Sequence, residues 1–258
     1  MTIETNASSA GTSALLQQMF GLNGKTILVT GASNGIGMAV AQTCAASGAQ
    51  VIVTGRNAAR LAATLESLQG DGHRQFIGDL LQTETVQKLA AECGPVDGLV
   101  HSAGVRGLAP MKLVSESFLK EVTEINYIAP VMLTRHLLAR QAIRPGGSVV
   151  FLSSIAAFTG TVGVGPYSGS KAALIGTMRP LALELARRKI RVNALCPGLV
   201  ETSLITEDKA WFEEMAKRYP LGIGQPQDIA LACLYFLSEA SGKITGQAVH
   251  MDGGIEFV

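Results

Sequence analysis

The feature that most constrains the fold is a regular alternation of short β-branched runs with longer amphipathic stretches. The short runs are apolar at almost every position, which is typical of parallel strands covered on both faces. They occupy residues 26–30, 50–54, 75–78, 98–102, 148–153, 191–196 and 247–251. The amphipathic stretches lie near 36–47, 57–69, 83–92, 115–140, 167–188 and 225–238. This pattern predicts an α/β fold with a doubly wound parallel sheet of about seven strands and helices on both faces.

The alternation continues without a linker, so we expect a single domain over residues 23–258. Residues 1–22 read as a polar tail that we expect to be flexible, except for a short apolar helix near residues 15–20 that docks on the body. Residues 199–224 interrupt the alternation with extra helical sequence. An insertion at this place predicts a lid or a wall of a substrate pocket.

Composition excludes several classes of partner. The formal net charge of +1 leaves no basic surface for nucleic acid or for an anionic membrane. Four cysteines lie far apart, at positions 44, 93, 196 and 233, which argues against a metal site or a disulfide framework and favours a reducing, cytoplasmic location. The N-terminus lacks the pattern of a secretory signal, and no apolar run reaches the roughly 18 residues of a membrane span.

A glycine-rich turn follows the first predicted strand. The segment TGASNGIG, residues 30–37, leads directly into a helix. Gly31, Gly35 and Gly37 permit a tight turn, a close approach of the backbone to a phosphate and close packing of the helix on the strand. Glycine is common in loops, but in this strand–turn–helix context the helix N-terminus also offers free N–H groups to an anion. The segment therefore predicts a dinucleotide-binding site.

The end of the second predicted strand bears on the type of dinucleotide. Gly55 stands where a carboxylate usually meets a free ribose 2′-hydroxyl, and Arg56 follows it. A guanidinium can hold a 2′-phosphate with two charge-assisted hydrogen bonds. We therefore expect NADP(H) to be favoured over NAD(H), the alternative being that Arg56 is an ordinary exposed loop residue.

Five further features combine with the glycine turn. Tyr167 and Lys171, in YSGSK, share a helix face, although two ordinary surface side chains at this spacing would do the same. Ser154 closes the fifth predicted strand, and Asn126 lies in the long helix. The segments VNALCPG (192–198) and TGQAVHMDGG (245–254) follow. Together these motifs resemble the short-chain dehydrogenase/reductase family from about Lys25 to Gly254.

The resemblance implies a Rossmann-type fold with a catalytic tetrad of Asn126, Ser154, Tyr167 and Lys171. A tyrosine with its ordinary pKa near 10 is a poor acid–base catalyst at neutral pH. We expect Lys171, together with a positive nicotinamide, to lower that pKa. The family pattern assigns Ser154 to the substrate carbonyl oxygen and Asn126 to a water between Lys171 and solvent. Alone, Ser154 would be a strand-end hydroxyl and Asn126 an unusual helix residue.

The same resemblance implies the residues that hold the cofactor. They are Gly31, Ser33, Asn34, Gly35, Ile36, Gly37, Arg56, Asp79, Leu80, Ala103, Gly104, Tyr167, Lys171, Pro197, Gly198 and Thr202. His101 departs from the family, which commonly has an asparagine there that braces the sheet. We expect a ring nitrogen of His101 to supply this brace, and a direct catalytic role is the alternative.

These observations predict an NADPH-dependent reductase of a ketone or aldehyde, a carbonyl reductase that is reversible to alcohol oxidation. A narrower alternative is a 3-oxoacyl-acyl-carrier-protein reductase, in which Arg187 and Arg188 would meet an acidic carrier protein. These two arginines also suit an ordinary helix end. A third reading is a non-catalytic NADP(H)-sensing protein on the same fold.

The substrate is expected to be an apolar or mixed small-molecule carbonyl compound. The insertion contributes Trp211, Phe212, Met215 and Tyr219, which either line a pocket or form the insertion's own core. Arg106 could contact an anionic group or lie exposed in its loop. The family resemblance implies a homo-oligomer, a tetramer or a dimer, built on the two long helices and the C-terminal segment.

Overall fold

The computed structural model describes residues 9–202 and 209–255. The strands are β1 (Thr26–Thr30), β2 (Gln50–Gly55), β3 (Arg74–Ile77), β4 (Val96–His101), β5 (Ile143–Leu152), β6 (Arg191–Pro197) and β7 (Ala248–Met251). The helices are α1 (Ser9–Phe20), α2 (Gly35–Ala46), α3 (Ala58–Glu66), α4 (Thr83–Glu92), α5 (Glu116–Thr123), α6 (Ala129–Ala139), α7 (Gly165–Leu185), α8 (Lys209–Ala216) and α9 (Pro226–Leu237).

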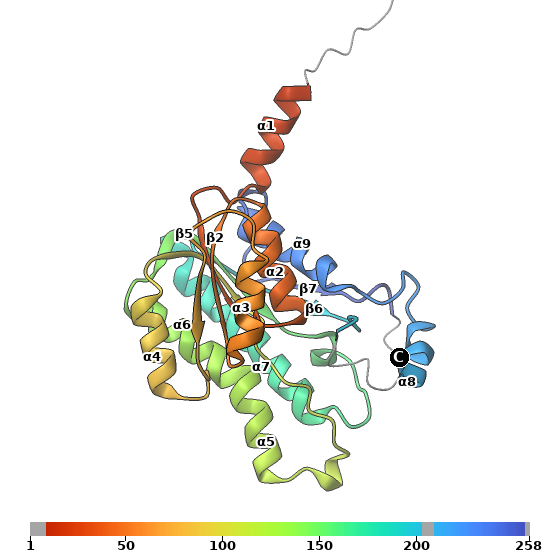
Figure 1. Cartoon of the computed structure of the whole chain (residues 1–258). Coiled ribbons are helices and arrows are strands. Elements are labelled where there is room, and N and C mark those ends of the chain that lie inside the picture. The colour runs from red at the N-terminus through yellow and green to blue at the C-terminus, as the bar shows by residue number, and fades with distance from the viewer. Residues whose placement is uncertain (1–8, 203–208, 256–258) are drawn as a thin grey trace, which may run out of the picture.

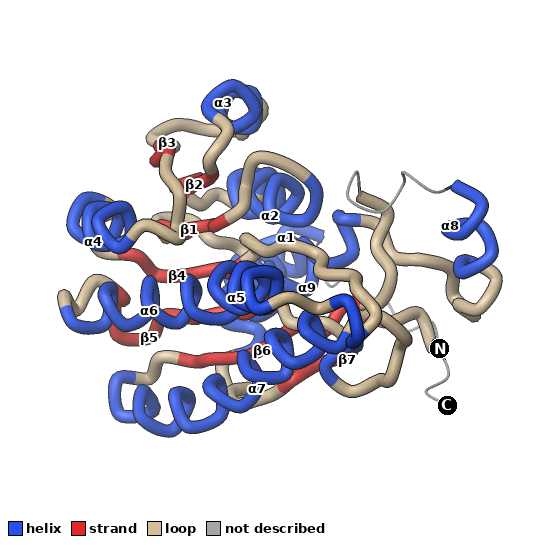
Figure 2. The backbone as a smooth tube through the Cα atoms, turned by 90° about the horizontal axis from the view of Figure 1, so that it is seen from below, coloured by secondary structure: helices blue, strands red, loops and turns tan. Residues whose placement is uncertain are grey.

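One parallel sheet runs through the molecule in the order β3-β2-β1-β4-β5-β6-β7 (Figure 2). All seven predicted strands are confirmed. The chain adds strands outward from β1 in one direction and then returns to add β4 on its other side. The boundary between β1 and β4 is therefore the switch point, where ligands bind at the carboxyl ends of such sheets.

Helices cover both faces of the sheet (Figure 1). On one face, α4, α6 and α7 pack over a core cluster that contains Leu133, Met178 and Phe151. On the other face, α2 and α9 pack over a second cluster that contains Val29, Val40 and Phe236. Strands β1, β2, β4, β5 and β6 contribute buried apolar side chains to both cores, which explains why these strands are apolar throughout.

The N-terminal segment differs from the expected docked helix. Residues Ser9–Phe20 form one helix, α1, that projects from the body (Figure 1). The side chains of Leu15 and Leu16 are exposed, and the ring of Phe20 lies 6.4 Å from the ring of Tyr235 on α9. The helix was predicted correctly. The prediction that it docks along its length on the body was wrong, because only its last turn contacts the body.

The predicted long helix over 115–140 is also different in detail. It consists of α5, a π-helical turn over Glu124–Ile128 and α6. Such turns widen the helix by one residue and are frequent at functional sites. Asn126 lies inside this turn.

The ends of the insertion come together beside the sheet. Val200 forms a parallel bridge with Gly224, and the Glu201 N–H donates to the Gly224 carbonyl at 2.9 Å. Helix α8 lies between these ends. No helix in the described ranges 9–202 and 209–255 is long and apolar enough to cross a membrane.

Candidate functional site

The glycine turn and the loop after β4 form a close-packed floor at the switch point. Gly31 has a φ of +66°, and a Cβ there would lie 2.7 Å from backbone atoms of Ala103. The Thr30 hydroxyl accepts hydrogen bonds from the N–H groups of Ser102 and Ala103, at 3.1 and 3.2 Å. Sequence reasoning missed Thr30 as the residue that joins the two loops.

Helix α2 begins directly on this turn. A Cβ at Gly37 would lie only 2.3 Å from the carbonyl oxygen of Gly31, so the first turn of the helix can pack this closely only with glycine at position 37. Asn34 is the N-cap and accepts from the Gly35 N–H at 2.8 Å. Glycines thus leave a cradle at a helix N-terminus that side chains would fill, and this cradle fits the pyrophosphate of a dinucleotide.

Two further segments with predicted cofactor residues lie against the glycine turn. Gly55, at the end of β2, lies against Ser33 of the turn, and Arg56 is exposed beside them. Thr202, after β6, packs on Gly35, where a Cβ would lie 3.3 Å from its methyl group. Segments from both halves of the sheet therefore meet around one turn.

The loop after β3 contributes a local turn. The Asp79 carboxylate accepts from the Leu81 N–H at 3.1 Å, and Leu80 is buried. This arrangement fixes the backbone of the residues that the family pattern places near an adenine.

The segment after β6 is braced by Tyr219, one of the aromatic residues of the insertion. The Tyr219 hydroxyl accepts from the Leu199 N–H at 3.0 Å, and a Cβ at Gly198 would lie 2.9 Å from the Tyr219 ring. The Gly198 N–H in turn donates to the Met251 carbonyl at 3.0 Å. Tyr219 thus holds the Pro197–Gly198 segment in place, while Phe212 and Met215 remain partly exposed. The side chain of Trp211 lies outside the described residues.

Tyr167 and Lys171 lie together on α7, with Lys171 buried. The Lys171 ammonium lies 5.7 Å from the centre of the Tyr167 ring and donates to the Leu152 carbonyl at 2.9 Å. The Ser153 hydroxyl donates to the Lys171 carbonyl at 2.9 Å, and it is a brace that sequence reasoning missed. The end of β5 therefore holds both the backbone and the side chain of Lys171.

Ser154 faces the tyrosine from the end of β5. Its hydroxyl forms a hydrogen bond with Tyr167 and accepts from the Ala156 N–H at 3.1 Å. It also lies 3.5 Å from the Pro197 carbonyl. Ser154 therefore lies between the catalytic candidate Tyr167 and the cofactor segment after β6.

Asn126 holds a loop. Its Oδ1 accepts from the Val105 N–H at 2.8 Å, and its Nδ2 donates to the Val105 carbonyl at 3.0 Å and to the Ser170 hydroxyl at 3.2 Å. A Cβ at Gly104 would lie 2.9 Å from Asn126 and 3.4 Å from the Lys171 ammonium. The geometry makes Asn126 the clamp between the loop after β4 and α7. The water that the family pattern implies stays a prediction.

The pKa of Tyr167 is set by opposing effects. Burial raises the pKa of Tyr167, whereas its hydrogen bond with Ser154 and the positive charge of Arg106 lower it. The expected lowering by Lys171 together with a positive nicotinamide stays a prediction. Burial lowers the pKa of Lys171 itself to about 8, which weakens its average positive charge near that pH.

Arg106 was expected to be an exposed loop residue or a contact to an anionic substrate group. It is partly buried, next to the residue that Asn126 clamps. The loop continues to Ala109, whose N–H donates to the Gly163 carbonyl at 2.8 Å, just before α7. The loop is thus fixed at both ends around Tyr167, which explains why the charge of Arg106 acts on that phenol.

His101 supplies the expected brace. Its Nε2 lies 2.8 Å from the Thr134 hydroxyl on α6, and its ring stacks on Phe151 at 4.9 Å. Burial lowers the pKa of His101 to about 3, so the ring is neutral at physiological pH. The alternative of a direct catalytic role does not suit a buried neutral ring packed between β4 and α6.

The assembled site combines the glycine cradle with a cluster of candidate acid–base side chains. Asn126, Ser154, Tyr167 and Lys171 come together at the carboxyl ends of β4, β5 and β6. A phenol and a hydroxyl side by side can stabilise and protonate a carbonyl oxygen. In the described residues, no group of three or more His, Cys, Asp or Glu side chains could hold a metal ion.

Comparisons with known proteins agree with this arrangement. The sequence model of the family described as enoyl-(acyl carrier protein) reductase matches residues 31–256. The chain is 35% identical over 246 residues to 3-oxoacyl-[acyl-carrier-protein] reductase FabG of Aquifex aeolicus (strain VF5), covering 91% of this chain and 98% of the relative. It is 36% identical over 244 residues to dehydrogenase/reductase SDR family member 4 of Homo sapiens, covering 90% and 88%.

A solved structure adds a cofactor-bound neighbour. The crystal structure of a blue fluorescent protein from a metagenomic library in complex with NADPH superposes with a TM-score of 0.85 at 30% identity, covering 91% of this chain and 98% of that one. Family match, relatives and fold all agree with the motifs. The chain is an NAD(P)-dependent oxidoreductase and belongs to the short-chain dehydrogenase/reductase family.

Proposed function

We propose that the protein is an NADPH-dependent reductase of ketones or aldehydes, reversible to alcohol oxidation. The observation that carries the proposal is the convergence of Ser154, Tyr167 and Lys171 beside the glycine cradle. A scaffold that only bound a nucleotide would have no need for a buried lysine under a tyrosine, because burying an ammonium costs free energy.

Each residue has a separate role in carbonyl reduction. A bound nicotinamide supplies the hydride that the reaction requires. Ser154 donates a hydrogen bond to the substrate oxygen, where negative charge develops. Tyr167 gives its proton to that oxygen, and Arg106 and Ser154 favour the resulting phenolate. Lys171 would hold the ribose of a bound cofactor, and Asn126 keeps the loop beside Lys171 in place.

Arg56 supports the preference for NADP(H). It is exposed at the end of β2, beside Gly55 and Ser33, and this strand end has no carboxylate that would repel a 2′-phosphate. The NADPH-bound structural neighbour is consistent with this choice.

We expect Arg56→Asp to move the ratio of kcat/KM for NADPH over NADH toward NADH by at least about tenfold, since one charge-assisted contact is worth about 1.5–3 kcal/mol. The control Arg179→Asp changes an equally exposed arginine on α7 and should leave the ratio unchanged. An unaltered ratio in Arg56→Asp would refute the assignment.

A 3-oxoacyl thioester is the second candidate substrate, because a curated relative at 35% identity is a 3-oxoacyl-[acyl-carrier-protein] reductase. Of the two arginines expected to meet a carrier protein, Arg188 donates to the Ile143 carbonyl and is therefore partly structural. Arg187 is exposed and is the one available to an acidic partner.

A panel of carbonyl compounds, followed by NADPH absorbance, tests the proposal. We expect oxidation of NADPH with at least one simple ketone, aldehyde or 3-oxoacyl thioester. Thioester turnover well above that of matched simple ketones would select the carrier-protein reductase. Tight NADPH binding with no turnover on the whole panel would instead favour the non-catalytic reading.

We also propose a homo-oligomer, a tetramer or a dimer. Ile128, Met132 and Leu183 are large apolar side chains exposed on the long helices. Exposed apolar side chains on one face are typical of subunit contacts.

A further inference from the structure

Two loops beside the candidate acid–base side chains expose large apolar residues. In the loop after β4, Leu108 is 50% exposed and Met111 is 71% exposed. In the loop after β5, Val162 is 94% exposed. An apolar surface of several large side chains that is open to solvent marks a place where another molecule binds.

The two loops hold each other in place. The Ala109 N–H donates to the Gly163 carbonyl at 2.8 Å, so the segments on either side of this hydrogen bond come together. The Met111 side chain packs on Gly165 at the start of α7, where an added Cβ would lie 3.1 Å from its methyl carbon. We call the exposed apolar residues at these contacts the apolar rim: Leu108, Met111 and Val162.

The apolar rim lies next to the place where a carbonyl group would react. Tyr167 follows Gly165 by two residues on α7, and two residues of helix span about 3 Å. Ser154, which forms a hydrogen bond with Tyr167, precedes the loop that carries Val162. A chain of a few methylenes on a carbonyl carbon at Ser154 and Tyr167 therefore reaches the rim.

The composition of both loops favours hydrocarbon over a charged chain. Residues 155–166, IAAFTGTVGVGP, contain no charged side chain. In residues 107–113, GLAPMKL, the charged side chain is that of Lys112, which is exposed. Sites that bind small molecules are lined mostly by apolar side chains with a few polar groups. Here Ser154 and Tyr167 supply polar groups, and the apolar rim supplies an apolar wall.

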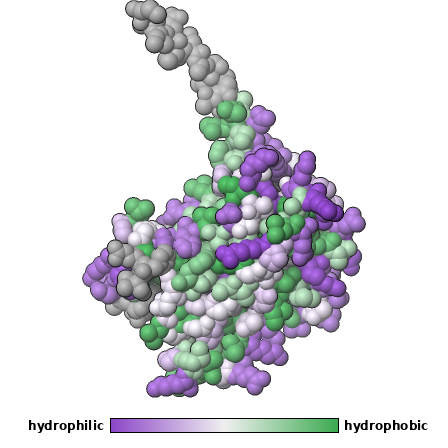
Figure 3. All heavy atoms as spheres, turned by 180° about the vertical axis from the view of Figure 1, so that it is seen from behind, coloured by the Kyte–Doolittle hydropathy of each residue, from purple (hydrophilic) through white to green (hydrophobic). Residues whose placement is uncertain are grey.

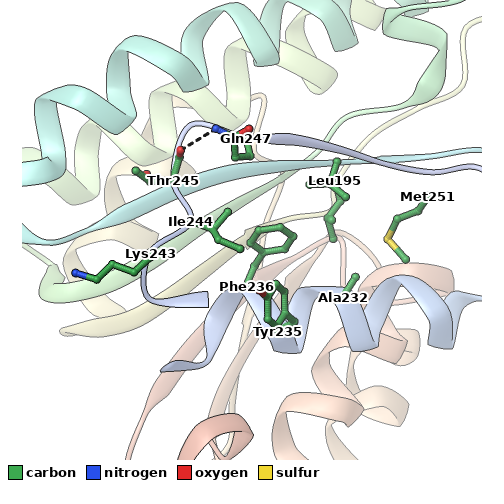
Figure 4. A pocket seen from close by; sticks show the side chains of 10 residues that line it. Leu195, Ala232, Tyr235, Phe236, Lys243, Ile244, Thr245, Gln247 and Met251 are labelled. Atoms are coloured by element: carbon green, nitrogen blue, oxygen red, sulfur yellow. Dashed lines mark hydrogen bonds between the residues drawn. The ribbon is translucent and has the colours of Figure 1, made fainter. Parts of the chain in front are cut away.

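Other apolar surfaces of the chain lie elsewhere. Helix α1, apolar where it leaves the body in Figure 3, projects from the end of the molecule opposite α5 (Figure 1). An open groove of about 590 Å³ between α9 and β7 is lined by Tyr235, Phe236 and Val249 among others (Figure 4). Helix α9 packs on one face of the sheet, and α7 with Tyr167 packs on the other. Of these surfaces, the apolar rim is the one that a chain attached at Tyr167 can reach.

We propose that the apolar rim binds the hydrocarbon chain of the substrate, which is a carbonyl compound with an extended alkyl or acyl chain. This inference rests on the proposed reduction of a carbonyl group at Ser154 and Tyr167, and it makes Leu108, Met111 and Val162 specificity residues. It applies to both candidate substrates, because a long-chain ketone and a 3-oxoacyl thioester each carry a chain on the reacting carbon.

A homologous series of methyl ketones, from four to ten carbons, tests the rim. If the carbonyl panel selects thioesters, 3-oxoacyl thioesters of increasing chain length replace the ketones. We expect kcat/KM to rise by at least about twofold per added methylene, because a fully buried methylene is worth about fourfold. The rise should appear mainly in KM, since the chain is bound equally in the ground state and the transition state.

The double variant Met111→Gln/Val162→Thr replaces two rim side chains by polar ones of similar size. We expect its loss of kcat/KM to grow with chain length, so that the gain per methylene falls below about 1.5-fold. NADPH affinity should stay within about threefold of the wild type, because both side chains are exposed and lie outside the glycine cradle. The control Leu16→Gln changes an exposed leucine on α1 and should keep the full gain with chain length.

Titration calorimetry of the NADPH-saturated protein with the same compounds separates this inference from the proposed function. An absence of turnover on the whole panel would refute the proposed function, and the rim would still predict a Kd that falls with chain length. A Kd and a kcat/KM that do not depend on chain length would overturn the rim. A full gain per methylene in Met111→Gln/Val162→Thr would overturn it as well.

Discussion

At the scale of one residue, Lys171 shows that a group of the proposed site can lower the stability of the fold. Its ammonium is buried, and burial lowers its pKa from 10.5 to about 8. Below pH 8 the folded protein holds a charge in poorly polar surroundings, while above about 10.5 the unfolded chain is neutral too. The cost of burial is therefore largest below pH 8 and disappears as the pH rises to 10.5.

We predict that Lys171→Met abolishes turnover but stabilises the fold at pH 7. The pKa displacement corresponds to on the order of 3 kcal/mol, and loss of the hydrogen bond to the Leu152 carbonyl offsets about 1 kcal/mol. Urea unfolding at pH 7 should show a gain of about 2 kcal/mol that shrinks by pH 10. A variant that is less stable than the wild type at both pH values would contradict this.

We expect Arg106 to act on the proposed reaction through the charge that it places near Tyr167. Its positive charge lowers the pKa of Tyr167, so Arg106→Gln should raise that pKa. In alcohol oxidation, where the phenolate is the active form, the rise of kcat/KM with pH should move to higher pH. The control Lys112→Gln, on an exposed lysine nearby in the chain, should leave the profile in place. Coincident profiles for Arg106→Gln and the wild type would exclude the effect.

At the scale of elements, the turn between β1 and α2 depends on the missing side chain of Gly37. A Cβ there would meet the Gly31 carbonyl oxygen at 2.3 Å, a backbone atom that cannot rotate away. We predict that Gly37→Ala lowers the free energy of unfolding by about 1–3 kcal/mol. It should also weaken NADPH binding at least tenfold, because the first turn of α2 must shift.

Gly176→Ala is the matched control for this variant. Gly176 lies inside α7 with nothing within 4 Å of an added Cβ, so alanine should raise the free energy of unfolding by about 0.5–1 kcal/mol. Chemical unfolding and NADPH titration of both variants provide the measurement. Equal NADPH affinities for Gly37→Ala and Gly176→Ala would show that the turn does not form the cradle.

The elements also show what the sequence could and could not predict. Strand β1 was predicted at its observed ends, because a run buried on both faces has a local signature. The π-helical turn at Glu124–Ile128 was not predicted. It accompanies hydrogen bonds between Asn126 and Val105, which lies in a loop before α5. Contacts of this kind are set by tertiary packing and leave no periodic trace.

The same limit holds for the site. The glycine turn and the Tyr167–Lys171 pair could be predicted, since their function depends on fixed local spacing. The charge of Arg106 on Tyr167 could not, because it requires the loop that Asn126 and Gly163 hold from opposite ends. The direction of α1 also depended on contacts of its linker with the body.

At the scale of the whole molecule, both halves of the sheet contribute to the proposed reaction centre. The glycine turn after β1 supplies the cradle, and β5, β6 and α7 supply the acid–base groups. Thr202 and Tyr219 connect them, because one packs on Gly35 and the other braces Gly198. We therefore expect cofactor binding and proton transfer to depend on different side chains. A mutation should then be able to abolish one of them and leave the other unchanged.

Tyr167→Phe tests the central claim most directly, because it removes one hydroxyl and leaves the glycine cradle intact. NADPH oxidation with a carbonyl substrate that the wild type accepts, measured together with NADPH affinity, gives the result. We predict a loss of kcat of at least about 10³-fold, at the middle of the range for acid–base catalysis, with NADPH affinity changed less than about threefold. Turnover by Tyr167→Phe within tenfold of the wild type would contradict the account.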